Sequence, residues 1–84
     1  MYINKYGIII KKLLHEKYPQ KYRELKINGN LYTFIFNVQN EIEEYKRKLI
    51  HNNKPITQSK LIEILDDVNK AIYITVDEIG NREF

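Results

Sequence analysis

The sequence of 84 residues contains no cysteine and no tryptophan, and only three glycines and two prolines. The absence of cysteine excludes disulfides and thiolate metal sites, and it is typical of a reducing cytoplasm, where we expect the protein to act. No apolar run approaches the ~20 residues of a membrane span, the longest being Ile8-Ile9-Ile10. The first five residues also lack the pattern of a signal peptide. We therefore expect no membrane partner.

Groups that carry catalysis or bind metals are equally scarce. His15 and His51 lack a second ligand three or four residues away, and the glycines are too scattered for a phosphate-binding loop. Ser59, the only serine, lacks the glycines of a nucleophile elbow. The adjacent acids Glu43-Glu44 would point about 100° apart on a helix. We therefore predict no catalytic residue, no metal site, no cofactor and no enzymatic activity.

The residues that are present are typical of a small globular protein. They are 43% hydrophobic and 12% aromatic, which excludes a disordered chain. Ile, Lys and Asn number fourteen, eleven and nine against a single Ala, a bias typical of AT-rich coding. This bias points to a bacterial, phage or mobile-element source.

Charge is unevenly distributed along the chain, whose formal net charge is +3. Residues 1–30 hold seven Lys or Arg and two Glu, whereas residues 55–84 hold three basic and six acidic residues. The two ends are therefore expected to attract each other within the fold, or else to steer a charged partner.

The first third of the sequence predicts two helices. Residues Ile3 to Tyr18 have apolar side chains at helical spacing, and Gly7 within them indicates a close crossing with another helix. Pro19 ends this helix and suits the first position of a short one over residues 19–27. Asn28-Gly29 stops the short helix. The same pair could instead turn a β-hairpin, which the poor alternation of the flanking residues disfavours.

The clearest signal is a heptad seam that predicts a long central helix over residues 31–51. The seam consists of Leu31, Ile35, Val38, Ile42, Tyr45 and Leu49. After a turn at residues 51–55, Thr57 can cap a last helix. The apolar stripe of that helix consists of Leu61, Leu65, Val68, Ile72, Val76 and Ile79. The β-branched segment 71–76 leaves a strand as the alternative.

Together these elements predict an all-α fold, a small helical bundle of three main helices plus one short helix, as a single helical domain over residues 1–84. The first and last helices are expected to pack on the central one. The expected core consists of Ile3, Tyr6, Ile10, Leu13, Tyr22, Leu25, Leu31, Ile35, Val38, Ile42, Tyr45, Leu49, Leu61, Leu65, Val68, Ile72 and Val76.

The basic first third supplies a candidate nucleic-acid surface, in which cations alternate with tyrosines that could stack on bases. The candidate residues are Lys5, Lys11, Lys12, Lys17, Lys21, Arg23 and Lys26. Alternatively, the tyrosines pack in the core and the lysines only keep the protein soluble. A helix-turn-helix that starts at Thr57 is a weaker hypothesis, because Asp66-Asp67 would repel phosphate.

Aromatic residues at the start of the central helix supply a second candidate surface. Tyr32, Phe34 and Phe36 lie on more than one face of that helix, so one face is expected to meet a partner or a second copy of the chain. Phe36 is the strongest candidate because it lies opposite the seam. Cover by the first or last helix is the alternative.

Several short motifs follow one another in a familiar order: Tyr6-Gly7, Leu13-Leu14-His15-Glu16-Lys17, Tyr22-Arg23-Glu24-Leu25 and Gly29-Asn30-Leu31. This order resembles the small TnpV family encoded on conjugative transposons, in which such a segment runs into a long amphipathic helix. The resemblance covers about residues 6–50 and contains no catalytic motif. It implies an all-helical accessory protein of a mobile element.

Three functions follow as hypotheses. The first is a non-enzymatic binding module of a mobile element or phage that acts on a host or element protein, and an anti-CRISPR-like inhibitor of a host defence nuclease is its sharpest form. The second is a nucleic-acid-binding accessory factor that uses the basic first third. The third is a structural homo-oligomer, with a homodimer as its simplest form.

Overall fold

The structure, a computed structural model, describes residues 2–81, which fold into helices and connecting turns. The helices are α1 (Lys5–Lys17), α2 (Pro19–Ile27), α3 (Leu31–Asn52) and α4 (Gln58–Gly80). No strand occurs among the described residues. The predicted all-α fold is confirmed, and the two β alternatives, a hairpin at Asn28-Gly29 and a strand over residues 71–76, are wrong.

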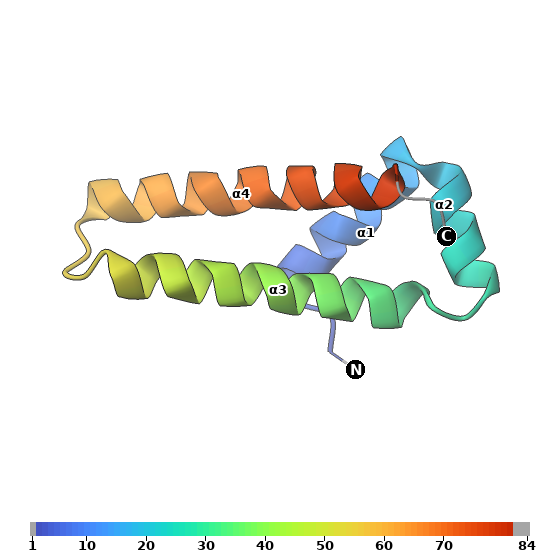
Figure 1. Cartoon of the computed structure of the whole chain (residues 1–84), viewed down its shortest axis with the longest axis horizontal. Coiled ribbons are helices and arrows are strands. Elements are labelled where there is room, and N and C mark those ends of the chain that lie inside the picture. The colour runs from blue at the N-terminus through green and yellow to red at the C-terminus, as the bar shows by residue number, and fades with distance from the viewer. Residues whose placement is uncertain (1, 82–84) are drawn as a thin grey trace.

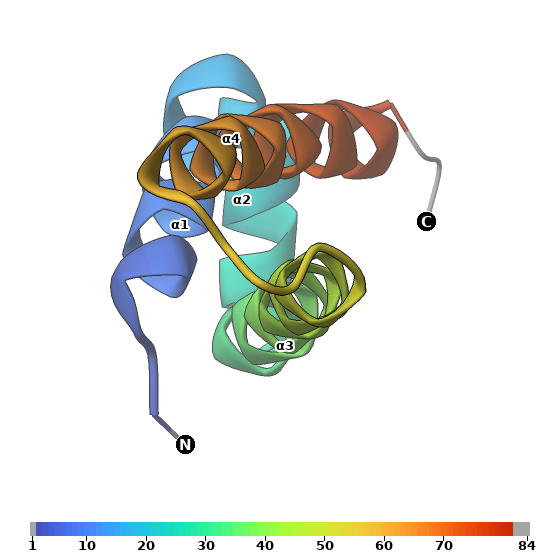
Figure 2. The same ribbon diagram turned by 90° about the vertical axis from the view of Figure 1, so that its left-hand side faces the viewer.

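The two long helices form an antiparallel hairpin that sets the length of the molecule, whose principal extents are 45 × 24 × 18 Å (Figure 1). Helix α1 crosses this hairpin on one side, and α2 lies across the end that is remote from the 53–57 loop. Viewed along the hairpin, α1, α3 and α4 occupy the corners of a triangle (Figure 2). Because α1 is short, the loop end of the hairpin consists of α3 and α4 alone.

Local capping explains where the helices begin and end. The Asn4 side chain accepts hydrogen bonds from the backbone N–H groups of Tyr6 and Gly7, so α1 begins at Lys5 and not at Ile3 as the apolar pattern predicts. Gly29, with φ of +75°, makes the left-handed turn after α2. Thr57 caps α4 by accepting a hydrogen bond from the backbone N–H of Lys60, at 3.1 Å, as predicted.

Gly7 lies where α1 crosses α3 most closely. A Cβ atom at this position would stand 2.2 Å from Oε1 of Gln39 and 3.2 Å from Cγ2 of Ile35. Gln39 is only 2% exposed; its Oε1 accepts a hydrogen bond from the backbone N–H of Asn4, and its Nε2 donates to the carbonyl of Tyr2. The crossing predicted from Gly7 is therefore present and is fixed by a buried amide.

The observed core agrees with the prediction on α3 and on the second half of α4, and it departs from the prediction near the loop. The buried apolar residues are Tyr6, Ile10, Leu14, Leu25, Leu31, Ile35, Val38, Ile42, Ile64, Val68, Ile72, Val76 and Ile79. Three predicted core residues are exposed: Tyr45 at 40%, and Leu61 and Leu65 at 38% each. Three buried residues, Leu14, Ile64 and Ile79, were not in the predicted core.

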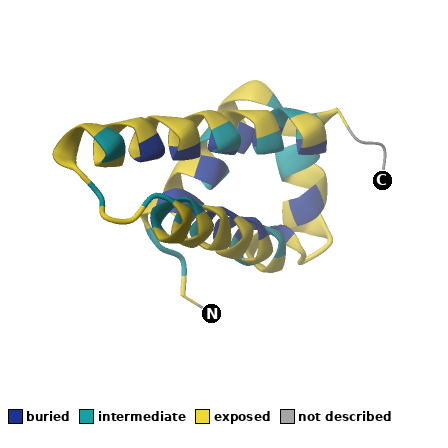
Figure 3. Cartoon of the chain, turned by 60° about the vertical axis from the view of Figure 1, so that its left-hand side comes forward, coloured by how far each residue is buried: buried dark blue, intermediate teal, exposed yellow. Residues whose placement is uncertain are grey.

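The physical reason for these exceptions is the limited reach of α1. Leu61 and Leu65 lie on the stripe that continues into Val68 and Ile72, but α1 does not extend over that part of the hairpin, so no third helix covers them (Figure 1). The burial pattern in Figure 3 shows the same change, from buried positions in the middle of α4 to exposed ones near the loop.

Helix α4 runs unbroken through Asp66-Asp67, where a helix-turn-helix would require a turn, so that hypothesis is wrong. None of the helices within residues 2–81 combines the length and hydropathy that a membrane-spanning helix needs.

Candidate functional site

The structure divides the seven candidate cations among different surroundings. Lys17 pairs with Asp77 of α4, with 2.6 Å between Nζ and Oδ1, and the Tyr18 hydroxyl donates to the same oxygen at 2.9 Å. Among the described residues this is the one ion pair that joins the first third of the chain to the last. It supports the expected attraction between the two ends of the sequence.

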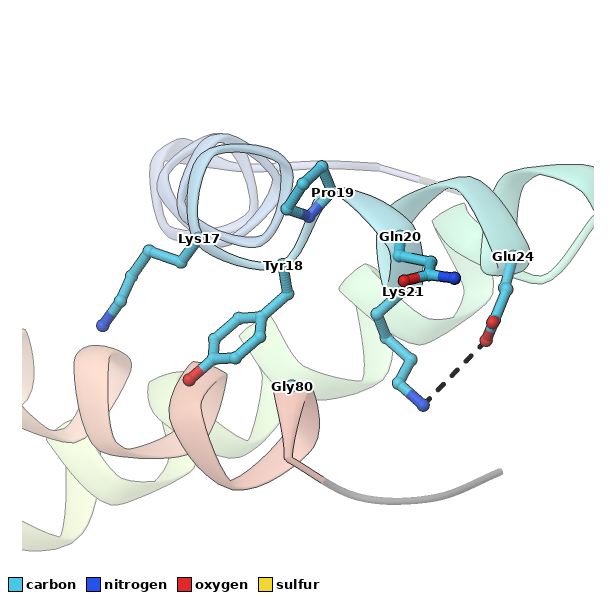
Figure 4. A pocket seen from close by; sticks show the side chains of 7 residues that line it. All are labelled: Lys17, Tyr18, Pro19, Gln20, Lys21, Glu24 and Gly80. Carbon is cyan, nitrogen blue, oxygen red and sulfur yellow. Dashed lines mark ion pairs between the residues drawn. The ribbon is translucent and has the colours of Figure 1, made fainter.

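A hollow of about 490 Å³ lies beside this contact, where α2 leaves α1 and α4 ends (Figure 4). The Tyr18 ring lies over Gly80, where a Cβ would come within 2.4 Å of ring atoms. Lys21 and Glu24, one turn apart on α2, also line the hollow, with 4.0 Å between Nζ and Oε2. Both lysines of this hollow, Lys17 and Lys21, thus have carboxylate partners, which leaves little positive charge for an anionic ligand.

Two further cations lie apart from each other and from this hollow. Lys12 lines a second hollow, of about 430 Å³, together with Glu16, Asn69 and Tyr73, between α1 and α4. Lys5 lies at the start of α1, with Nζ 5.2 Å from the centroid of the Tyr6 ring. The predicted seven-residue basic surface is therefore not one surface.

The remaining three cations come together with three aromatic rings, which we name the ring–cation cluster. It consists of Lys11, His15, Tyr22, Arg23, Lys26 and Tyr32. Lys11 Nζ donates to the Tyr32 hydroxyl at 3.0 Å and lies 5.1 Å from that ring's centroid. The rings of His15 and Tyr22 are 4.5 Å apart between centroids. A hollow of about 200 Å³ lies between His15, Pro19, Tyr22, Arg23 and Lys26.

The local sequence explains why these side chains converge. Lys11 and His15 are one turn apart on α1, and Tyr22 and Lys26 are one turn apart on α2, so each pair lies along one side of its helix. The Pro19 junction then folds α2 back beside α1. Tyr32, in the first turn of α3, comes next to them because α3 begins directly after the Gly29 turn.

Positive charge dominates the electrostatics of the ring–cation cluster. The hydrogen bond from Lys11, together with the charges of Lys11 and Lys26, lowers the pKa of the Tyr32 hydroxyl. The same hydrogen bond raises the pKa of Lys11, which keeps its charge at neutral pH. Within residues 2–81, no carboxylate lies at ion-pair distance from Lys11, Arg23 or Lys26.

The aromatic residues at the start of α3 do not share one face. Phe34 is partly buried against the core and lines a hollow with Thr75 and Ile79 of α4. Phe36 is half-buried, and Tyr32, which is 52% exposed, belongs to the ring–cation cluster. The structure thus places Tyr32, Phe34 and Phe36 in different surroundings, with Phe34 packed towards α4, and a partner for any of them stays a prediction.

A different apolar surface takes their place, which we name the apolar end surface: Leu61, Ile62 and Leu65 of α4 and Ile9 of α1. All four are exposed, Ile62 at 62% and the others at 38%. Ile9 lines a hollow with Asn69, which lies one turn after Leu65 on α4. Sequence reasoning missed it because the same leucines were assigned to the core.

The comparisons with known proteins add nothing to this geometry. No protein-family model matches the chain, and neither a curated protein nor a solved structure matches it. The resemblance to the TnpV family therefore stays a prediction. Within residues 2–81 no group of three or more His, Asp or Glu side chains could hold a metal ion, and the predicted lack of metal, cofactor and catalytic residues likewise stays a prediction.

Proposed function

We propose that this chain is a non-enzymatic binding module that contacts another protein through the apolar end surface. The observation that carries the proposal is the exposure of Leu61 and Leu65, at 38% each, on the stripe that forms the core one turn further along α4. Large apolar side chains at core-forming positions without cover are typical of surfaces that a partner completes.

The geometry of the surface indicates the kind of partner. Helix α1 lies beside part of the hairpin formed by α3 and α4, and it does not reach the loop end (Figure 1). The uncovered first turns of α4, residues 58–65, are about 12 Å long. An amphipathic helix of a partner, with apolar residues three and four apart, would supply the missing third helix there.

The composition supports a sharper form of this proposal. The excess of Ile, Lys and Asn favours a mobile-element or phage source, so the partner would be a host or element protein. The sharpest form is inhibition of a host defence nuclease, as anti-CRISPR proteins do. A structural homodimer through the same surface is the competing function, because a second copy could supply the covering helix.

The test compares a double variant on the apolar end surface with a single control variant elsewhere on α4. Leu61→Glu/Leu65→Glu places charge on the apolar end surface, whereas Ile74→Glu places it at a 58% exposed position on another side of α4. Circular dichroism should show that both variants keep their helices. A tagged wild type and Ile74→Glu should capture the same protein from a nuclease-treated lysate of the source organism, and Leu61→Glu/Leu65→Glu should not.

Two results would contradict the proposal. Capture that disappears on nuclease treatment would assign the interaction to nucleic acid. A wild type that sediments as a dimer, with Leu61→Glu/Leu65→Glu a monomer, would assign the surface to a second copy of the chain.

A further inference from the structure

We propose that the ring–cation cluster binds single-stranded nucleic acid, with phosphates held by Lys11, Arg23 and Lys26 and a base stacked on the exposed rings. This site is separate from the apolar end surface, since it lies where α1, α2 and the start of α3 meet, and α4 contributes no residue to it. The inference therefore does not depend on the proposed protein partner.

Charge is the first argument for an anionic ligand. Two of the chain's other basic side chains, Lys17 and Lys21, have carboxylates within ion-pair distance, at 2.6 Å from Asp77 and 4.0 Å from Glu24. By contrast, Lys11 bonds to a neutral hydroxyl, and no described carboxylate pairs with Arg23 or Lys26. Three cations on one surface without counter-charges concentrate a positive potential that phosphates can neutralise.

The rings are the second argument, and they distinguish a nucleic acid from other anions. His15 is exposed and lies 4.5 Å from Tyr22, centroid to centroid, while Tyr32 is 52% exposed on the neighbouring helix. Tyr22 packs partly against the core, which holds the ring pair in place. Rings set among cations are what proteins use to stack bases while the backbone runs along the charges.

The size of the hollow and the exposure of the rings favour an extended single strand. At about 200 Å³ the hollow is smaller than the usual range of small-molecule pockets. A polymer that lays successive groups across the surface does not need an enclosing cavity. A duplex would present phosphates but keep its base faces stacked, so it would use the cations and not the rings.

The direct experiment is fluorescence anisotropy with a labelled oligothymidylate of about twelve nucleotides, measured over a series of salt concentrations. Three neutralised phosphates predict a slope of about −2 for the logarithm of affinity against the logarithm of salt concentration. A duplex of the same length should bind more weakly. Affinity that is independent of salt, or higher for the duplex, would overturn the proposal.

Two charge variants separate the cluster from the net charge of the protein. Arg23→Gln/Lys26→Gln removes two of the three proposed phosphate contacts. We expect the affinity at low salt to fall at least tenfold. The salt slope should approach about −1, because roughly one phosphate contact remains. Lys48→Gln/Lys54→Gln removes the same charge from exposed positions at the loop end and should change affinity less than threefold, as roughly expected of screened distant charges. Equal losses in the two variants would contradict a local site.

Tyr32→Leu tests the stacking separately from the charge. Loss of one stacked base predicts an affinity reduced roughly fivefold or more with an unchanged salt slope, because the phosphate contacts remain. Unchanged affinity would contradict the role of the ring. An acidic peptide such as oligoglutamate should compete poorly; competition as strong as that of unlabelled oligothymidylate would assign the cluster to acidic protein segments and overturn the nucleic-acid proposal.

Discussion

Single residues at the crossing of α1 and α3 control how the bundle closes. Gly7 provides the space and Gln39 fills it, with its amide bonded to the backbones of Asn4 and Tyr2. The two residues act together, because the Gln39 oxygen is the atom closest to the place where a Cβ would stand on Gly7.

Gly7→Ala should destabilise the protein even though alanine favours a helix by about 1 kcal/mol. The added Cβ would meet Gln39 and two apolar side chains at the crossing, and such overpacking typically costs about 1–3 kcal/mol. Urea denaturation of both proteins measures the difference. Gly29→Ala is the comparison, since it meets no atom within 4 Å and should lose about 1–2 kcal/mol through its positive φ alone. A Gly7→Ala variant that is more stable than wild type would show that the crossing of α1 and α3 has room for a Cβ atom.

Gln39→Met keeps the volume of the side chain and removes both of its hydrogen bonds. Because the backbone N–H of Asn4 and the carbonyl of Tyr2 lose their partner, we expect a loss of about 1–3 kcal/mol in unfolding free energy. Asn40→Met, at the exposed neighbouring position, should stay within about 0.5 kcal/mol of wild type. Chemical denaturation decides between these values, and equal effects would contradict a structural role for the buried amide.

At the scale of the elements, the contact between α1 and α4 should depend on pH. Hydrogen bonds from Lys17 and then Tyr18 lower the pKa of Asp77. A folded-state pKa below the unfolded value adds stability above the usual carboxyl pKa, and this stability is lost as the pH falls through the folded value.

Asp77→Asn should therefore lower the melting temperature at about pH 7 and have little effect at about pH 2.5, where the wild-type carboxyl is protonated as well. Asp67→Asn removes an exposed acid from the same helix and should show no such convergence of the two pH values. Thermal unfolding followed by circular dichroism gives both comparisons. An Asp77→Asn effect that persists at low pH would show that the ion pair is not its cause.

The helix bounds could be predicted closely from the sequence because their signals are local. Pro19, Gly29 and Thr57 act through the backbone of their own neighbours, and each stands at a helix boundary in the structure. The exposure of Leu61 and Leu65 could not be predicted, because it depends on how far α1 reaches along α4, which no local pattern encodes. The ring–cation cluster was predicted only in part, since its cations were identified and His15 was not.

The whole molecule is unevenly stabilised along its length. Three helices meet around Ile10, Ile35 and Ile72, which are at most 1% exposed, whereas only α3 and α4 contact each other near the loop. The free energy of local unfolding should therefore rise with distance from the 53–57 loop.

Two neighbouring residues near the start of α4 test which side of this helix is covered at the loop end. Ile64→Ala removes a side chain that is 1% exposed and should cost about 2–5 kcal/mol. Leu65→Ala removes one that is 38% exposed and uncovered by α1, so its cost should stay below about 1 kcal/mol. Equilibrium unfolding of the two variants gives both values. Similar costs would mean that Leu65 is covered in solution, as it would be in a dimer.

The register set by Gly7 links the two proposed surfaces. If α1 slid one turn, about 5.4 Å, towards the loop, Lys11 would arrive at the crossing, where no side chain fits. The same slide would cover Leu65 and separate Lys11 from Tyr32. A single residue without a side chain thus sets the extent of the apolar end surface and the composition of the ring–cation cluster at once, so a substitution there would alter both proposed surfaces although Gly7 belongs to neither.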